Sequence, residues 1–182
     1  ITTEYEKTGK LPSEGPFFEQ GGVKLFADAR NEKALGGGRS LADVLKAHLS
    51  RVGRGDYLAL LAYLHMSASH EERLQSIRHR VRDGKRVATC LGFGPRFLHS
   101  TGQAYKGGPN SGVFLQVTAD DGKDLPVPGQ RYTFGVVKAA QARGDFQVLA
   151  ERERRALRVH LGPDVGAGLR ALEAAVEKAL GS

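Results

Sequence analysis

Tryptophan is absent from the 182-residue sequence, and cysteine and methionine occur once each. The single cysteine, Cys90, cannot form a disulfide within the chain, which indicates a protein of the reducing cytoplasm. Cys90 lies in an apolar run, so we expect a buried, unreactive thiol rather than a nucleophile. No apolar run approaches the ~18 residues that are needed to cross a bilayer. We therefore expect no membrane partner.

Motifs for metals, nucleotides and serine hydrolysis are also missing. Six histidines occur, but none forms a His-x-x-x-His or Glu-x-x-His pair on a predicted helix, and there is no Cys-x-x-Cys. We predict neither a metal site nor a cofactor. No Gly-x-Ser-x-Gly motif supports Ser100 as a hydrolase nucleophile. The glycines at 36–38 lack the P-loop pattern, and we interpret residues 31–39 as a loop that ends in a flexible connection.

A net charge of +7 favours anionic partners. The densest basic cluster spans residues 73–86, on and just after one predicted helix, and no aromatic residues are interleaved with it to stack on bases. A solvated helix face explains this cluster better than a nucleic-acid interface. We expect no nucleic-acid partner, whereas phosphorylated small molecules remain open.

The organisation is that of one domain behind an arm. Residues 1–22 are polar and rich in Gly and Pro, which predicts an extended arm or linker. Residues 23–182 are sufficient for a single domain with its own core. The chain begins with Ile1 and has no signal-peptide pattern, and we expect a fragment of a longer protein.

The order of elements predicts an α/β fold in three layers with a mostly parallel sheet. Residues 57–64 and 86–91 are continuously apolar, as in strands covered on both faces. We expect them to be adjacent and parallel, joined by a helix at about 70–83. Residues 156–161 alternate between apolar and polar, which predicts a strand near an edge with one solvent-exposed face. Further strands are expected at 23–27 and 112–118, and further helices at 41–49, 132–142, 146–154 and from 163 onward.

Helix boundaries follow from capping residues and glycines. Ser40 with Asp43, and Ser69 with Glu72, have the spacing of capping boxes, and Thr133 is a candidate cap. Gly84 and Gly144 are expected to end their helices.

The polar segment 94–110 follows the predicted strand at 86–91, and its composition predicts a loop at the edge of the sheet where ligands bind in open α/β folds. His99 is the candidate acid/base, because imidazole transfers protons near neutral pH. Lys138 lies among apolar neighbours and either extends from a buried helix or points into a cleft. A polar surface loop without a function is the alternative. The candidate substrate-binding residues are Ser100, Thr101, Gln103, Lys106, Gly107 and Gly108, with Arg96 and Lys138 as further candidates.

Three segments carry a resemblance to a known family. Leu98-His99-Ser100-Thr101-Gly102-Gln103, followed by Lys106-Gly107-Gly108, resembles the Leu-His-Ser-x-Gly-Gln loop of bacterial glucose-6-phosphate isomerases. Residues 5–12, 94–110 and 132–142 are similar to the C-terminal region of bifunctional transaldolase/glucose-6-phosphate isomerase fusions. The resemblance runs from about residue 1 to residue 162.

The resemblance implies a flavodoxin-like sugar-isomerase fold. It also implies a reaction that interconverts glucose 6-phosphate and fructose 6-phosphate without a metal. The family histidine, which His99 matches, assists opening of the sugar ring. A family glutamate then moves the proton between C1 and C2 through an enediol. The family's Glu-Ser-x-Gly-Lys and Phe-Asp-Gln-Pro motifs are both missing here.

Because those two motifs are missing, we expect the isolated chain to be inactive and its partners to be a phosphorylated sugar and the rest of the parent chain. Assembly into a homo-oligomer is left open. A noncatalytic phosphosugar-binding or regulatory domain of the same fold is the alternative.

Overall fold

The computed structural model describes residues 5, 7–9 and 11–181. A six-stranded sheet with the order β1-β2-β6-β5-β3-β4 forms its centre. The β6–β5, β5–β3 and β3–β4 pairs are parallel, and β2 pairs with both β1 and β6 antiparallel. The strands are β1 (Phe18–Gln20), β2 (Val23–Phe26), β3 (Tyr57–Tyr63), β4 (Ala88–Phe93), β5 (Gly112–Thr118) and β6 (Arg155–His160).

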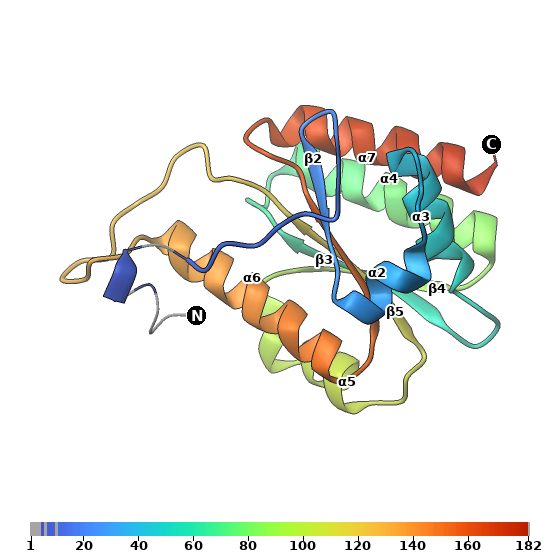
Figure 1. Cartoon of the computed structure of the whole chain (residues 1–182), viewed down its shortest axis with the longest axis horizontal. Helices are drawn as coiled ribbons and strands as arrows, with labels where there is room; N and C mark the ends of the chain where they lie inside the picture. The colour runs from blue at the N-terminus through green and yellow to red at the C-terminus, as the bar shows by residue number, and fades with distance from the viewer. Residues whose placement is uncertain (1–4, 6, 10, 182) are drawn as a thin grey trace.

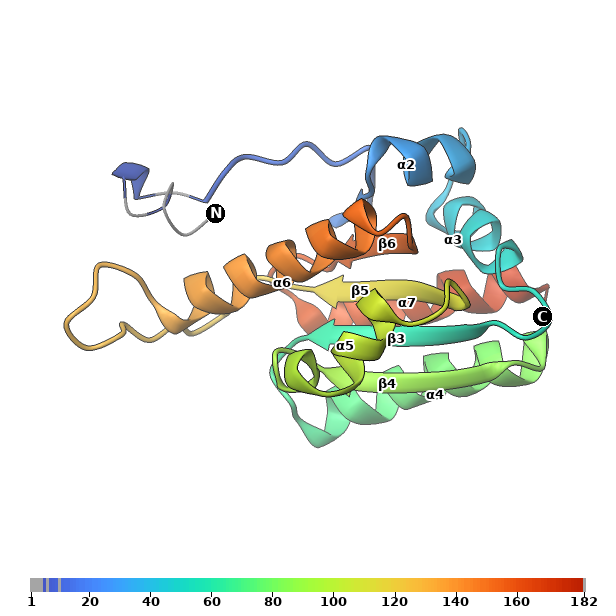
Figure 2. The same cartoon turned by 90° about the horizontal axis from the view of Figure 1, so that it is seen from below.

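Helices cover both faces of the sheet, so the predicted three-layer α/β fold is confirmed (Figure 1). One face packs against α3 (Leu41–Ser50), α4 (Ala68–Lys85) and α7 (Val165–Leu180), and it holds the larger core. The other face packs against α5 (Thr101–Gly107) and α6 (Phe134–Glu151), as Figure 2 shows from below. Among the described residues, no helix has both the length and the apolar character needed to cross a membrane.

The central strands form because both of their faces are buried. In β3, every residue from Leu58 to Tyr63 is buried, and in β5 the run from Gly112 to Val117 is buried. Leu60 is paired with Leu91 of β4 on one side and Leu115 of β5 on the other. The predicted adjacent parallel strands at 57–64 and 86–91, joined by a helix, are therefore confirmed as a pair. The prediction that the second strand is covered on both faces was wrong, because β4 spans Ala88–Phe93 at the edge of the sheet and has no buried residue.

Two predicted caps are confirmed and one is displaced. The Ser40 hydroxyl accepts a hydrogen bond from the Asp43 amide at 3.1 Å, and the Thr133 hydroxyl accepts one from the Val136 amide at 3.2 Å. The cap of α4 is Ser67 rather than Ser69, because β3 ends early enough for Ser67 to take the extended conformation before the first turn. Helix α4 also runs past Gly84 and ends at Lys85.

Two further helix predictions were wrong. Residues 31–39 were expected to form a loop, but Ala29–Leu35 forms α2. The buried Asn31 side chain holds that helix, donating to the Arg154 carbonyl at 3.0 Å and accepting from Arg51 at 2.8 Å. Gly144 does not end a helix: α6 continues through it, because the core contacts of Phe146 and Leu149 outweigh the ~1 kcal/mol cost of an internal glycine.

The strand and arm predictions need similar corrections. β6 is not at an edge, since it lies between β2 and β5 and its residues 156–159 are buried. Its alternation comes from Arg158, a charged residue that is only 4% exposed. The sheet edges are β1 and β4. Residues 18–20 form β1, inside the predicted arm, and residues 1–4, 6 and 10 of that arm lie outside the described residues.

Candidate functional site

The carboxyl ends of the central strands open into a cavity of about 480 Å³. Strands β3, β5 and β6 end there, helix α6 forms one wall, and residues from the segment 11–16 form another. The cavity is lined by the polar residues Glu14, Lys24, Tyr63, Thr118, Asp120, Asp121, Asp124, Lys138, Arg143, Arg158 and His160. Its lining is thus dominated by ionisable groups of both signs.

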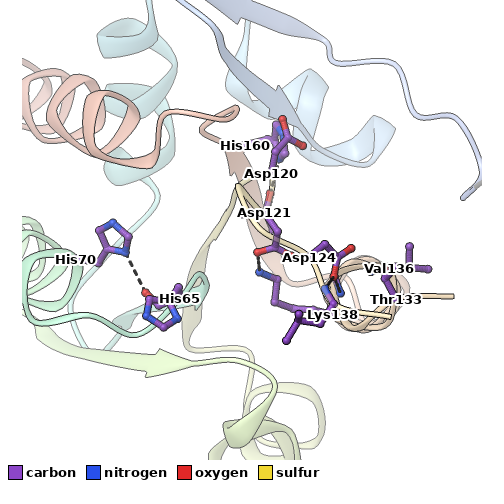
Figure 3. A network of polar contacts seen from close by, with 12 residues as sticks. His65, His70, Asp120, Asp121, Asp124, Thr133, Val136, Lys138 and His160 are labelled. Carbon is purple, nitrogen blue, oxygen red and sulfur yellow. Dashed lines mark hydrogen bonds and ion pairs between the residues drawn. The ribbon is translucent and has the colours of Figure 1, made fainter. Parts of the chain in front are cut away.

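Lys138 points from the first turns of α6 towards the end of β5 and forms an ion pair with Asp121 (Figure 3). Of the two interpretations of Lys138, the structure therefore favours the cleft. Asp124 fixes the start of the same helix, since its carboxylate accepts a hydrogen bond from the Gly135 amide at 2.8 Å. Hydrogen bonding from the Thr133 hydroxyl, and then from that amide, lowers the pKa of Asp124.

His160 stands at the end of β6 beside Asp120 (Figure 3). Its Nδ1 lies 3.1 Å from the Thr118 hydroxyl, and its Nε2 lies 3.4 Å from an Asp120 oxygen. Burial lowers the pKa of His160 below its ordinary value, and the nearby Asp120 carboxylate opposes that shift. The ring is therefore held in one orientation at the cavity wall.

A second cavity, of about 610 Å³, adjoins the first along Asp120, Asp121 and Lys138. It lies between the end of β3 and the start of α7, and His65 and His70 line it. The ring Nδ1 of His70 lies 2.9 Å from the carbonyl oxygen of His65. The two cavities therefore form one continuous surface from His65 to His160 at the carboxyl ends of the strands, with polar groups set among apolar residues such as Leu64 and Val165. No group of three or more metal-ligating side chains occurs among residues 5, 7–9 and 11–181.

A carboxylate and two guanidinium groups meet on the α6 side of the sheet. Glu14 accepts from Arg158 Nη2 at 2.7 Å and lies 2.9 Å from Arg143 Nε. The Arg158 guanidinium is also 4.2 Å from the ring centroid of Phe26. All three charged residues of this cluster line the first cavity.

The segment 94–110 is helical rather than a loop. It forms the 3-10 helix η1 (Arg96–His99) and α5 (Thr101–Gly107). Phe97 and Tyr105 are buried, and Phe97 packs edge-on against Tyr63 with ring centroids 5.6 Å apart. The apolar contacts of these two residues hold the segment against the core. The high Gly and Pro content of the segment had instead predicted a loop. His99, at the end of η1, is exposed.

The remaining predicted site residues of this segment divide into two groups. Ser100, Thr101 and Gln103 are exposed beside His99, and the Gln103 amide donates to the Leu98 carbonyl at 2.6 Å. The exposed Arg96 lies with Nη1 3.4 Å from the Met66 sulfur.

Lys106 and the glycines after it belong to an internal contact with other elements. Lys106 Nζ lies 2.5 Å from a carboxylate oxygen of the buried Asp145 on α6. Arg154 donates to the carbonyl groups of Lys106 and Gly108, both at 2.7 Å, which holds the chain around Gly107. Neither of these two cavities is lined by a residue of η1 or α5, so His99 does not join Lys138 in either of them.

Sequence reasoning missed Glu14, Asp120, Asp121, Arg143 and Arg158. One signal could have found two of them: Asp120 and Asp121 come almost directly after the buried strand β5, where a parallel strand presents its ligand-binding end. The other three come from separate segments and share no local pattern.

No protein-family model and no curated protein matches the sequence. Among solved structures, the fold is similar to that of a hypothetical protein, TT0462, from Thermus thermophilus, with a TM-score of 0.64 and 17% sequence identity. The match covers 83% of this chain and 42% of that protein, so the chain spans less than half of its length. At this identity the likeness shows the fold alone.

Proposed function

We propose that the chain is the C-terminal part of a glucose-6-phosphate isomerase of the kind fused to transaldolase, with a sugar-isomerase type of three-layer fold. The observation that carries the proposal is the position of His99. The residue that matches the family histidine is exposed on a short helix directly after β4, at the carboxyl edge of the parallel sheet.

The proposed role of His99 is proton transfer during ring opening. The imidazole takes the proton of the anomeric hydroxyl and delivers a proton to the ring oxygen as the C1–O5 bond breaks, which leaves the open-chain sugar. Because Phe97 and Tyr105 anchor η1 and α5 in the core, the imidazole is carried by a supported element. A positioned acid/base group of this kind contributes about 10²–10⁴-fold in rate.

Ser100, Thr101 and Gln103 lie next to His99 and supply exposed hydroxyl and amide groups for a hydroxyl-rich phosphosugar. The glutamate that moves the proton between C1 and C2 has to come from the rest of the parent chain, because its motif is missing from this sequence. The chain alone should therefore bind a phosphosugar without turning it over.

The second candidate, a noncatalytic phosphosugar-binding module, is favoured by a specific observation. His99 lines neither of the two cavities described above, and the glutamate motif that turnover requires is missing from this sequence.

The test compares His99→Gln with His79→Gln in the full-length parent protein, because His79 lies on α4, across the sheet from α5. Fructose 6-phosphate turnover is followed by a coupled dehydrogenase assay. We expect His99→Gln to lower turnover about 10²–10⁴-fold and His79→Gln to leave it unchanged. Unchanged turnover in a folded His99→Gln protein would remove His99 from the mechanism, and a parent without isomerase activity would leave the binding module.

A further inference from the structure

The wall of the 480 Å³ cavity holds two arginines from different layers, Arg158 from the central strand β6 and Arg143 from α6. Arg158 is only 4% exposed. Its guanidinium lies over the ring of Phe26 at 4.2 Å and near that of Phe146 at 5.5 Å, and these contacts fix its position. A permanently charged group that is buried this deeply requires an anion beside it.

In this structure the anion is Glu14. Arg158 donates to both carboxylate oxygens, at 2.7 and 3.3 Å, and Arg143 Nε lies 2.9 Å from one of them. Three N–H groups thus converge on one carboxylate. Arg143 also donates to the Pro12 carbonyl at 2.5 Å.

The two sides of this contact differ in how they are supported. The arginines are carried by a central strand and a long helix, whereas Glu14 belongs to a segment, residues 11–16, without regular secondary structure. The Glu14 side chain keeps 34% of its surface exposed. Arg158 is therefore fixed, whereas solvent reaches part of both Glu14 and Arg143, whose side chain is 26% exposed.

We propose that Arg143 and Arg158 form a binding site for a phosphomonoester, and that Glu14 occupies this site when the ligand is absent. A dianionic phosphate offers more charge and more acceptor oxygens than one carboxylate, and the planar arginine fork suits it. Lys24 lines the same cavity and adds positive charge. The charge of Lys138 is offset by its ion pair with Asp121, and Asp120 and Asp124 also line the cavity. The site involves neither His99 nor its segment, so it does not depend on the proposed isomerase activity.

Displacement of Glu14 has a second consequence. The segment 11–16 loses its ion pairs to both arginines when phosphate takes its place, so a protease that cuts after glutamate should cleave the chain at Glu14 faster in the bound protein. A ligand that bound elsewhere would leave the rate of this cleavage unchanged.

The experiment titrates the 182-residue chain with inorganic phosphate by calorimetry at constant ionic strength. Charge-assisted hydrogen bonds are strong enough that Glu14→Gln, which removes the competing charge, should bind phosphate about tenfold more tightly than the unaltered chain. Arg143→Gln should bind it about tenfold more weakly. Glu19→Gln, an equal change of charge at an exposed position on β1, should leave the affinity unchanged.

The rate of proteolytic cleavage after Glu14 in the unaltered chain provides a readout that needs no variant to fold, and phosphate should raise it. Equal affinities for Glu14→Gln and Glu19→Gln, or cleavage that phosphate does not accelerate, would show that Glu14 is only a structural clamp and would overturn the proposal. A parallel titration with glycerol 3-phosphate tests the ligand class. Binding of phosphate without binding of this ester would overturn the assignment to a phosphomonoester.

Discussion

His48 should make the stability of the protein fall with decreasing pH more steeply than its carboxylates alone would. The side chain comes from α3, is fully buried, and its Nε2 lies 3.0 Å from the Phe114 carbonyl oxygen of β5. A carbonyl only accepts, so Nε2 is the donor, and complete burial favours the neutral ring. Burial, and then the nearby Arg51 charge, lowers the pKa of His48 to about 3.

The sign of this pH dependence follows from the protonation of His48 in the folded and unfolded states. An unfolded histidine has a pKa of about 6.5, so between about pH 6.5 and about pH 3 the unfolded chain binds a proton that the folded chain does not. Stability from this group is complete above about pH 6.5 and is lost as the pH falls. At ~1.4 kcal/mol per pH unit, the loss is about 2 kcal/mol at pH 5 and about 3 kcal/mol at pH 4.

Urea denaturation at pH 7.5, 6 and 5 measures this loss, with His48→Gln as the test variant and His79→Gln as the control. His48→Gln should be less stable at pH 7.5 because it disturbs a buried contact. Its free energy of unfolding should then fall about 2 kcal/mol less between pH 7.5 and pH 5 than that of the unaltered chain. Carboxylates contribute equally to both proteins, so parallel curves would refute the reasoning.

Two predictions concern stability at neutral pH. Lys106→Met should lower the free energy of unfolding by about 3–5 kcal/mol, because it leaves the buried Asp145 carboxylate without its cation. The double variant Lys106→Met/Asp145→Leu should recover much of that loss in urea denaturation. A loss below about 1 kcal/mol in the single variant would contradict the ion pair. Ser40→Ala should cost about 1 kcal/mol through loss of the α3 cap, whereas Ser50→Ala at the other end of the same helix should cost less, and the two thermal midpoints compare them.

The parts of the fold that could be predicted from the sequence are those whose stabilising contacts leave a local pattern. Strands β3 and β5 are covered on both faces, so their residues are largely apolar. The caps at Ser40 and Thr133 depend on atoms three residues apart. Burial and capping of this kind are visible in any short window of sequence.

The predictions that were wrong concern elements whose stabilising contacts come from residues distant in the sequence. The charge of Arg158 led to the prediction that one face of β6 is exposed to solvent. The carboxylate that neutralises this charge belongs to Glu14, 144 positions away in the sequence. Asn31 holds α2 through Arg154, 123 positions away. No local pattern contains such a partner, so a buried polar residue is mistaken for a solvent-exposed one.

The candidate site divides in the same way. The segment around His99 is continuous and could be singled out, although the anchoring of its helices by Phe97 and Tyr105 could not. The cavity is assembled from segment 11–16, the end of β5 and the helix α6. Its composition becomes visible only when these three are brought together.

The sheet order also bears on how the chain acquires its structure. Strand β2 pairs with β6 and β1, and the partners Lys24 and His160 are separated by roughly 140 residues of chain. The paired residues Tyr57 of β3 and Ala88 of β4 are separated by only about 30 residues of chain. Closing the longer loop between β2 and β6 therefore costs ~1 kcal/mol more in chain entropy. During synthesis the hairpin of β1 and β2 emerges early but has no sheet to join until β6 has left the ribosome. We therefore expect the parallel strands to assemble first and the N-terminal hairpin to dock late, leaving its apolar residues Val23 and Leu25 exposed to chaperones in the interval.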